Sequence, residues 1–261
     1  MRPIGYRSPL RTVARGVALV VTAALFLMPF VVLVRDGVAA LPRVFADDEV
    51  PFARSLVNST AVAVSQTLGQ LLLCSTAGYG LARIPFRGEP AVRYAVVATL
   101  LVPTAVTFVP SFVVVSSLGW VSDLRGLVVP GLFSAVNVFL FRQYFLDFPV
   151  ALEDAGRLDG LSRWGVFRRV VVPNSTGIFA AIAVIDFIGS WNQFLWPLVI
   201  AQDSSSWTVQ VALSSLLTAQ NPEVELLFAA AAVSILPIVL VFVLLQRHLV
   251  RGVTESGLTG N

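Results

Sequence analysis

The sequence predicts an all-α, polytopic membrane protein with about six transmembrane helices in a single domain. Of its 261 residues, 56% are hydrophobic and only 13% are charged, whereas soluble domains carry about 25% charged residues. The mean hydropathy is +0.82, so lipid must surround most of the chain. Long uniform apolar runs favour helices over a β-barrel, because each backbone polar group in hydrocarbon needs an internal partner.

Six apolar runs are long enough to cross a hydrocarbon core of about 30 Å, which takes roughly 20 residues. They cover residues 16–34, 56–82, 94–118, 126–141, 177–201 and 226–246. The second run exceeds the length of a perpendicular span, so we expect it to tilt or to extend beyond the membrane. Basic residues before the first run and small residues at 38–40 leave a cleaved secretory signal as an alternative for that run.

Arginine predicts the orientation, because cytoplasmic loops hold the excess of positive charge. With both termini in the cytoplasm, only four of the 18 basic residues fall on the outside. Those four are Arg35, Arg43, Arg54 and Arg125. The basic balance therefore reflects topology and contact with an anionic lipid bilayer. No basic patch with interleaved aromatics predicts a nucleic-acid partner.

The scarce residue types exclude several chemistries. Cys74 and His248 are the sole cysteine and histidine, so we expect no disulfide and no metal site. The chain contains no lysine, and a Walker A motif needs one to hold nucleotide phosphates. We therefore expect a non-catalytic chain that binds no cofactor, with any ATP hydrolysed by another protein. A membrane enzyme is disfavoured, since the runs lack clustered histidines, cysteines or paired carboxylates.

Residues 147–173 form a patterned segment between the fourth and fifth runs. Asp147 is a candidate N-cap with Pro149 in the first turn, Glu153 can pair with Arg157, and Gly160 ends the helix. Ser162 can then cap a second short helix, and Pro173 opens the next span. A connecting loop needs only a few residues, so this helix-turn-helix predicts a docking partner. The alternative is an amphipathic hairpin that lies on the membrane.

The same segment resembles the EAA loop of bacterial ABC importer permeases. The pattern of that loop is E-A-A, three residues, G, nine residues and then I-x-L-P. This chain has the same spacing, with Asp154-Ala155-Gly156, Gly160 and residues 170–173 (VVVP) at the matching positions, so that Asp replaces Glu and Gly replaces the second Ala. The resemblance implies a type I permease fold in the bacterial plasma (inner) membrane. It also implies a helix seated on a partner ATPase subunit, which binds the ATP and Mg²⁺. The contact residues that it implies are Glu153, Asp154, Ala155, Gly156, Asp159 and Gly160.

Other motifs resemble the carbohydrate, maltose-type branch of these permeases. Residues 191–198 (WNQFLWPL) are similar to W-N-(E/D/Q)-F-L-W-P-L, and residues 77–83 (AGYGLAR) resemble the end of that branch's second span. The resemblance covers roughly residues 55–252. It implies a second, non-identical permease subunit and an extracytoplasmic sugar-binding protein that docks on the external segment 202–225.

Polar residues recur along one face of the fifth run. Asp186, Ser190, Gln193 and Pro197 lie at i, i+4, i+7 and i+11, a helical spacing on a face that lipid would not tolerate. Ser59, Gln66 and Gln70 make a weaker stripe on the second run. The candidates for lining a translocation path are Gln66, Gln70, Asp186, Ser190, Trp191, Asn192, Gln193 and Phe194. The alternatives are interhelical hydrogen bonding, worth about 0.6 kcal/mol per bond, and, for the aromatics, a belt at the membrane interface.

The predicted function is that of a permease subunit in an ATP-driven carbohydrate importer that works by alternating access. A different class, an ion-coupled secondary transporter, would use Asp186 as its proton site. That alternative accounts for the acid but leaves the patterned segment 147–173 without a role.

Overall fold

The computed structural model describes residues 9–46, 49–219 and 223–257, which form helices and turns without a strand. The α-helices are α1 (Pro9–Gly37), α2 (Leu41–Ala46), α3 (Phe52–Arg83), α4 (Glu89–Leu100), α5 (Thr104–Ser117), α6 (Leu124–Val128), α7 (Ala135–Asp147), α8 (Val150–Leu158), α9 (Arg163–Val166), α10 (Val172–Asn174), α11 (Thr176–Trp191), α12 (Leu195–Ile200), α13 (Val209–Thr218) and α14 (Val224–Gly257). Single 3₁₀ turns are η1 (Val38–Ala40), η2 (Val129–Gly131) and η4 (Ser204–Ser206), and η3 (Phe167–Val171) is a π-helical turn.

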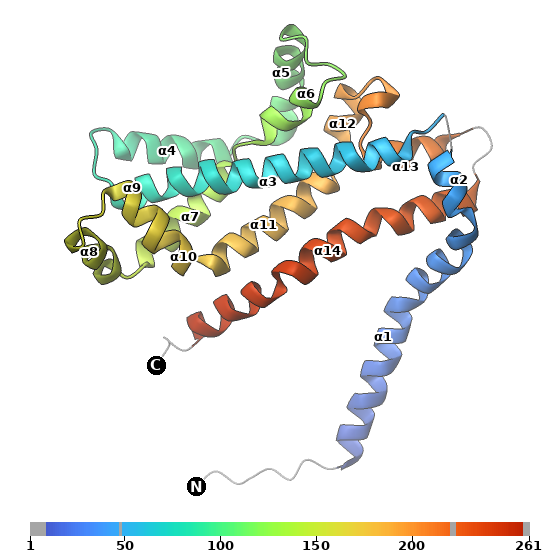
Figure 1. Cartoon of the computed structure of the whole chain (residues 1–261), viewed down its shortest axis with the longest axis horizontal. Helices are drawn as coiled ribbons and strands as arrows, with labels where there is room; N and C mark the ends of the chain where they lie inside the picture. Colours follow the sequence, from blue (N-terminus) through green and yellow to red (C-terminus); the bar gives the residue numbers. More distant parts are fainter. Residues whose placement is uncertain (1–8, 47–48, 220–222, 258–261) are drawn as a thin grey trace.

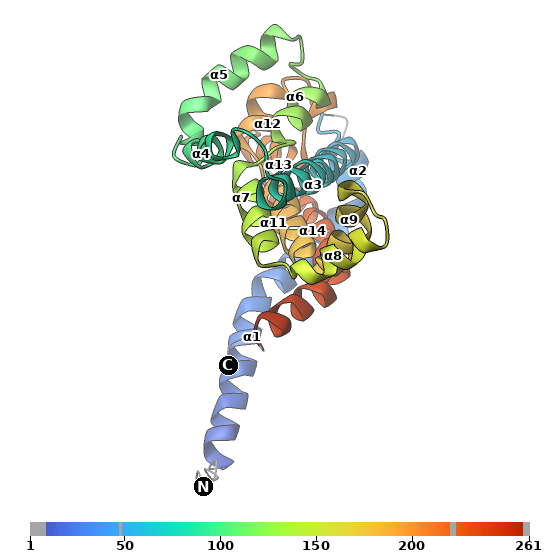
Figure 2. The same ribbon diagram turned by 90° about the vertical axis from the view of Figure 1, so that its left-hand side faces the viewer.

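Helix α3 is the axis of the bundle (Figure 1). It packs against α7 and α11, and α11 packs in turn against α14. Helices α8 and α9 lie at one end of α3, which we call the α8 end, while α2 and α13 lie at the other, the α13 end. Helix α1 contacts α14, and its N-terminal part projects away from the bundle, as both views show (Figures 1 and 2).

Small residues bring the helices close together. A Cβ atom on Gly78 of α3 would lie 2.7 Å from the Cβ of Phe141 and 2.9 Å from the backbone nitrogen of Arg142, both on α7. A Cβ atom on Gly37 would lie 2.7 Å from the backbone nitrogen of Ala229 on α14. Glycine is thus required at both crossings, as is common where helices pack tightly in membranes.

Among the described residues, two stretches are long and apolar enough to cross a membrane: Leu124–Asp147, which comprises α6, η2 and α7, and Val224–Arg247 of α14. Two bent pairs are apolar enough when taken together, and each is either one interrupted span or a re-entrant loop: Glu89–Leu100 with Thr104–Ser117, bent by 101°, and Arg163–Asn174 with Thr176–Trp191, bent by 79°. Gly16–Met28 is a shorter apolar helix. The run 56–82 lies inside α3, whose 32 residues give a length of about 48 Å at 1.5 Å per residue.

Three of the predicted runs are each divided between two or more helices. Run 94–118 breaks at residues 101–103, because proline disfavours a helical conformation at the residue before it, and Pro103 is itself extended with ψ 135°. Run 126–141 breaks at residues 132–134, after the 3₁₀ turn that contains Pro130. Run 177–201 unwinds at residues 192–194, before α12. Segment 202–225, which is predicted to be external, contains the helix α13.

Candidate functional site

Helix α8 and its flanking turns form the predicted helix-turn-helix at the α8 end. Gly160 has a φ of +82°, which ends α8 in the left-handed region that favours glycine. Ser162 Oγ accepts a hydrogen bond from the backbone N–H of Gly165 at 3.1 Å and so caps α9, as predicted. The start of α8 differs from the prediction, because Asp147 is the last residue of α7 and Pro149 takes the N-cap position. Figure 2 shows α8 at the outer edge of the bundle.

One face of α8 is open. Asp154, Ala155, Arg157 and Asp159 are exposed, and the Leu158 side chain is 89% exposed. An apolar side chain this accessible beside charged groups is a surface that another protein can cover. Four of the predicted contact residues are thus exposed on this face: Asp154, which pairs with Arg157 at 3.2 Å, and Ala155, Asp159 and Gly160.

The other face of α8 is buried, and it holds Glu153 and Gly156. Glu153 is 1% exposed. It accepts a hydrogen bond from the Tyr79 hydroxyl at 2.8 Å, and its Oε1 lies 2.9 Å from Nε of Arg83. The predicted pairing with Arg157 is confirmed, at 3.8 Å. The carboxylate of Glu153 is buried against α3, and its contact with an ATPase subunit stays a prediction.

Gly156 is buried against the segment that follows α9. A Cβ atom there would lie 3.1 Å from Cγ2 of Val170 and 3.4 Å from Cγ2 of Val166. Glycine in place of the alanine of the EAA pattern thus lets α8 sit close to Val170. Gly156 supports the packing of α8 and offers no surface for a partner.

A polar network joins three helices inside the bundle. Asn137 of α7 donates through Nδ2 to Oε1 of Gln70 on α3 at 2.6 Å, and to both carboxylate oxygens of Asp186 on α11 at 2.9 Å. The alternative of interhelical hydrogen bonding therefore describes Gln70 and Asp186. Asn137 was not among the predicted residues, although an asparagine inside an apolar run is a signal that could have identified it.

Two side-chain amides and an indole form a second set of hydrogen bonds. Their acceptors are backbone carbonyls of α6 and η2. With α7, these two elements form a discontinuous segment that we call the broken span. Gln66 donates to the Leu127 carbonyl and Gln70 to the Gly131 carbonyl, both at 2.8 Å. The indole Nε1–H of Trp196 donates to the Gly126 carbonyl at 3.0 Å. Pro130 has no N–H to pair with the Gly126 carbonyl four residues before it. These side chains therefore supply the partners that an unbroken helix would have provided.

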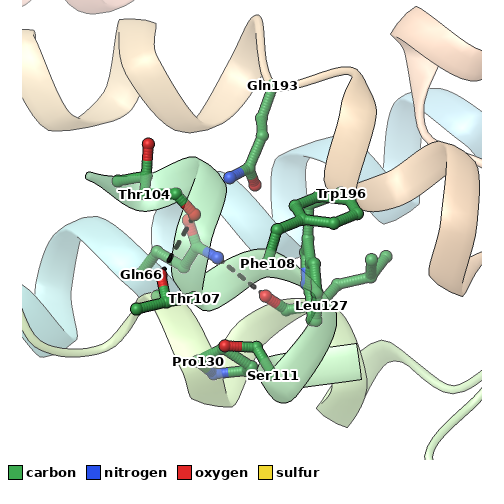
Figure 3. Close-up of a pocket in the computed structure, with 10 residues that line it drawn as sticks. Gln66, Thr104, Thr107, Phe108, Ser111, Leu127, Pro130, Gln193 and Trp196 are labelled. Atoms are coloured by element: carbon green, nitrogen blue, oxygen red, sulfur yellow. Dashed lines mark hydrogen bonds between the residues drawn. The ribbon is translucent and has the colours of Figure 1, made fainter. Parts of the chain in front are cut away.

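A cavity of about 180 Å³ opens beside the broken span (Figure 3). Its polar lining comes from Gln66, Thr104, Thr107, Ser111 and Gln193, and its apolar lining from Phe108, Leu127, Pro130, Gly131 and Trp196. Phe108 and Trp196 meet edge to face, with ring centroids 5.5 Å apart. Amide and hydroxyl groups next to aromatic faces suit a polar organic ligand, because they bind hydroxyl groups and C–H surface together.

The other predicted path residues have different surroundings. Trp191 is 1% exposed, stacks on Phe187 and donates through Nε1 to the Ser234 carbonyl at 3.1 Å. Its ring packs inside the bundle and is not among the residues that line the cavity. Asn192 accepts from Nε2 of Gln210 on α13 at 3.2 Å. Ser190 Oγ is buried without a hydrogen-bond partner among the described residues, and Phe194 is partly buried before α12.

Comparison with known proteins gives consistent relatives. The family model described as binding-protein-dependent transport system inner membrane component matches residues 70–255. The arabinooligosaccharides transport system permease protein AraQ of Bacillus subtilis is 32% identical, over 78% of this chain and 72% of its own length. The lactose transport system permease protein LacG of Rhizobium radiobacter is 34% identical, over 85% of this chain and 79% of its own length.

A third relative and a solved structure agree with these. The sn-glycerol-3-phosphate transport system permease protein UgpE of Yersinia pestis is 32% identical, over 80% of this chain and 75% of its own length. The fold is that of a chain in the crystal structure of a bacterial ABC transporter involved in the import of the acidic polysaccharide alginate. The two chains are 21% identical and superpose with a TM-score of 0.80. The match covers 94% of this chain and 99% of the chain in the crystal structure. The chain therefore belongs to the family of inner membrane components of binding-protein-dependent transport systems.

Proposed function

We propose that this chain is one of two non-identical permease subunits in an ATP-driven importer for a carbohydrate. The relatives AraQ and LacG are permease proteins for arabinooligosaccharides and lactose, and UgpE serves sn-glycerol-3-phosphate. A polyhydroxylated substrate is common to all three. The chain moves this substrate without altering it and binds no cofactor. Dependence on a binding protein, which the family name states, favours this function over an ion-coupled transporter driven through Asp186.

The observation that carries the proposal is the open face of α8, with its exposed Leu158, at the tip of a helix-turn-helix. A partner ATPase subunit, which holds ATP and Mg²⁺, would seat on Asp154, Ala155, Leu158 and Asp159. The α8 end then lies in the cytoplasm with both termini, and the α13 end faces outward from the bacterial inner membrane. An extracytoplasmic sugar-binding protein would dock at residues 202–225.

The cavity of Figure 3 supports a path beside the broken span. Gln66 lines it from α3 and Gln193 from the unwound turn between α11 and α12, while Gln70, Asn137 and Asp186 are not among its lining residues. Closure of the ATPase subunits on ATP would swing this chain and the second permease between inward-open and outward-open states. Sugar released by the binding protein would then pass between them.

Reconstitution tests the proposal. The chain would be purified with the second permease and the ATPase subunit, placed in proteoliposomes, and supplied with the binding protein and labelled oligosaccharides. We expect uptake that requires ATP and persists when ionophores collapse the ion gradients. Uptake that continues without ATP and stops with the ionophore would contradict the proposal and favour the alternative at Asp186.

A further inference from the structure

Glu153 is a buried carboxylate on a helix whose neighbouring charged residues are exposed. Asp154 and Arg157 lie on the surface, while Glu153 is 1% exposed and faces α3. Removing a carboxylate from water is costly, and a buried ion pair is weak evidence for added stability. A hydrophobic residue would fill this position at no such cost, so the carboxylate calls for another explanation.

Its partners lie one helical turn apart on the last turns of α3. The Tyr79 hydroxyl donates to Oε2 of Glu153 at 2.8 Å, and Nε of Arg83 lies 2.9 Å from Oε1. Arg83 also donates through Nη2 to the carbonyl of Phe148, the residue before Pro149. Two groups of α3 therefore hold both the entry to α8 and its first turn.

Helix α8 otherwise contacts α9 and the π-helical turn η3. The aromatic ring of Tyr79 lies against Phe167 of η3, with centroids 4.9 Å apart. The ion pair and this ring contact thus join the whole helix-turn-helix to the same end of α3.

Helix α3 continues from this anchor to the opposite end of the bundle without an internal proline. In its middle it carries Gln66 and Gln70, which hold the broken span. Near its start, Asn58 donates to the carbonyls of Ser205 and Trp207 at 3.0 Å, and Ser59 Oγ accepts from the backbone N–H of Val209 at 2.8 Å. One continuous helix therefore links α8, the cavity lining and the segment 202–225.

We infer that Glu153 is a positioning residue that locks α8 to α3, so that movement imposed on the open face of α8 reaches the path and the α13 end through α3. Tyr79 and Arg83 are its partners in this lock. This inference rests on the proposed function, because it requires a partner that moves α8. It assigns different roles to adjacent residues: Asp154 meets the partner, and Glu153 transmits the movement.

The test compares Glu153→Gln and Tyr79→Phe with Asp154→Ala in the complete transporter in proteoliposomes. Each preparation is assayed for co-purification of the ATPase subunit, for ATP hydrolysis and its stimulation by the binding protein, and for sugar transported per ATP. We expect the first two variants to retain the ATPase subunit and hydrolyse ATP. Their sugar transported per ATP should fall about tenfold or more, because hydrogen bonds to charged groups are among the strongest in proteins. Asp154→Ala should instead weaken co-purification.

A matched control removes another carboxylate at the same end. Glu89 pairs with Arg93 at 3.1 Å and lies 4.0 Å from Arg142, but it is not bound to α8. Glu89→Gln should therefore keep the wild-type ratio of sugar to ATP. An equal loss of coupling in this control would overturn the inference.

A reciprocal exchange, Glu153→Arg with Arg83→Glu, covers the case in which single variants fail to insert. The exchanged pair should recover coupling relative to either single variant. The inference is overturned if the exchanged transporter assembles without coupling, if Glu153→Gln keeps wild-type stoichiometry, or if Glu153→Gln loses the ATPase subunit as Asp154→Ala does. Failure of the wild-type protein to use ATP for uptake would instead refute the proposed function.

Discussion

Helix α3 makes polar contacts of two different kinds along its length. At the α8 end, Tyr79 and Arg83 bind the carboxylate of Glu153 on a separate short helix. In the middle, Gln66 and Gln70 bind backbone carbonyls of the broken span. We call these contacts the ionic bridge and the amide bridges.

The difference follows from the surroundings of each bridge. The ionic bridge lies at an end of the bundle, where the Arg83 side chain is 15% exposed although Glu153 is buried. The amide bridges lie between helices, where a charged donor would be costly and a neutral amide satisfies a carbonyl without net charge. Amide bridges thus fix α3 to the broken span, while the ionic bridge attaches a helix that can respond to a partner.

Breaking the contact between α3 and α7 should lower the free energy of unfolding most, because this contact supports both bridges. Gly78→Leu would place side-chain atoms where a Cβ atom already lies 2.7 Å from Phe141. We expect a loss of about 3 kcal/mol, the upper end for overpacking, because backbone must move as well. Thermal unfolding of the detergent-solubilised protein measures the loss. Gly80→Leu is the control, since a Cβ atom at Gly80 meets nothing within 4 Å. Equal destabilisation by both variants would contradict the close crossing.

Removing Asn137 should have the next largest effect. Asn137→Leu takes the shared donor away from Gln70 and Asp186, and an unpaired buried polar group costs about 1–3 kcal/mol. The same unfolding measurement should show a loss of about 2 kcal/mol within that range. Asp186→Asn is the companion variant, because its amide oxygen still accepts from Asn137. ATP-driven uptake should survive Asp186→Asn, and its complete loss would show that the carboxylate charge itself is needed.

The amide bridges can be tested through a single pair of residues. Gln66→Leu leaves the Leu127 carbonyl unpaired, and Gly131→Ala would place a Cβ atom 2.2 Å from Nε2 of Gln66. We expect each variant to lose about 1–2 kcal/mol on unfolding. The double variant should lose less than the sum, since both changes disrupt the same hydrogen bond. Fully additive losses would show that Gly131 acts independently of Gln66.

Sequence alone predicted those features whose causes are local. Gly160 and Ser162 end one helix and begin the next through their own backbone and hydroxyl groups, and the family indicated by the EAA pattern is confirmed. Pro103 marks the position of the break after Leu100, but the run 94–118 is defined by apolarity, which continues across the break. A pattern based on apolarity alone extends a helix through such a break.

Contacts between distant residues could not be predicted in this way. The inward orientation of Glu153 depends on which face of α8 meets Tyr79, 74 positions earlier. Asn137 finds Asp186 49 positions later, and Gln66 finds the Leu127 carbonyl 61 positions later. Periodicity places a residue on a face, and only tertiary packing decides which neighbour that face meets.

The smallest effect is expected at the turn that presents the open face of α8. Gly160 has a φ of +82°, so Gly160→Ala forces a side chain into the left-handed region at a cost of roughly 1 kcal/mol. Gly165→Ala is the control, because Gly165 lies in α9 without a positive φ and a Cβ atom there meets its nearest neighbours at 3.4 Å. Unfolding should distinguish the two by about that amount, and co-purification of the ATPase subunit should weaken only with Gly160→Ala. If the two variants behave alike, the left-handed turn is not what sets the position of α8, and the ionic bridge to α3 is sufficient to hold it.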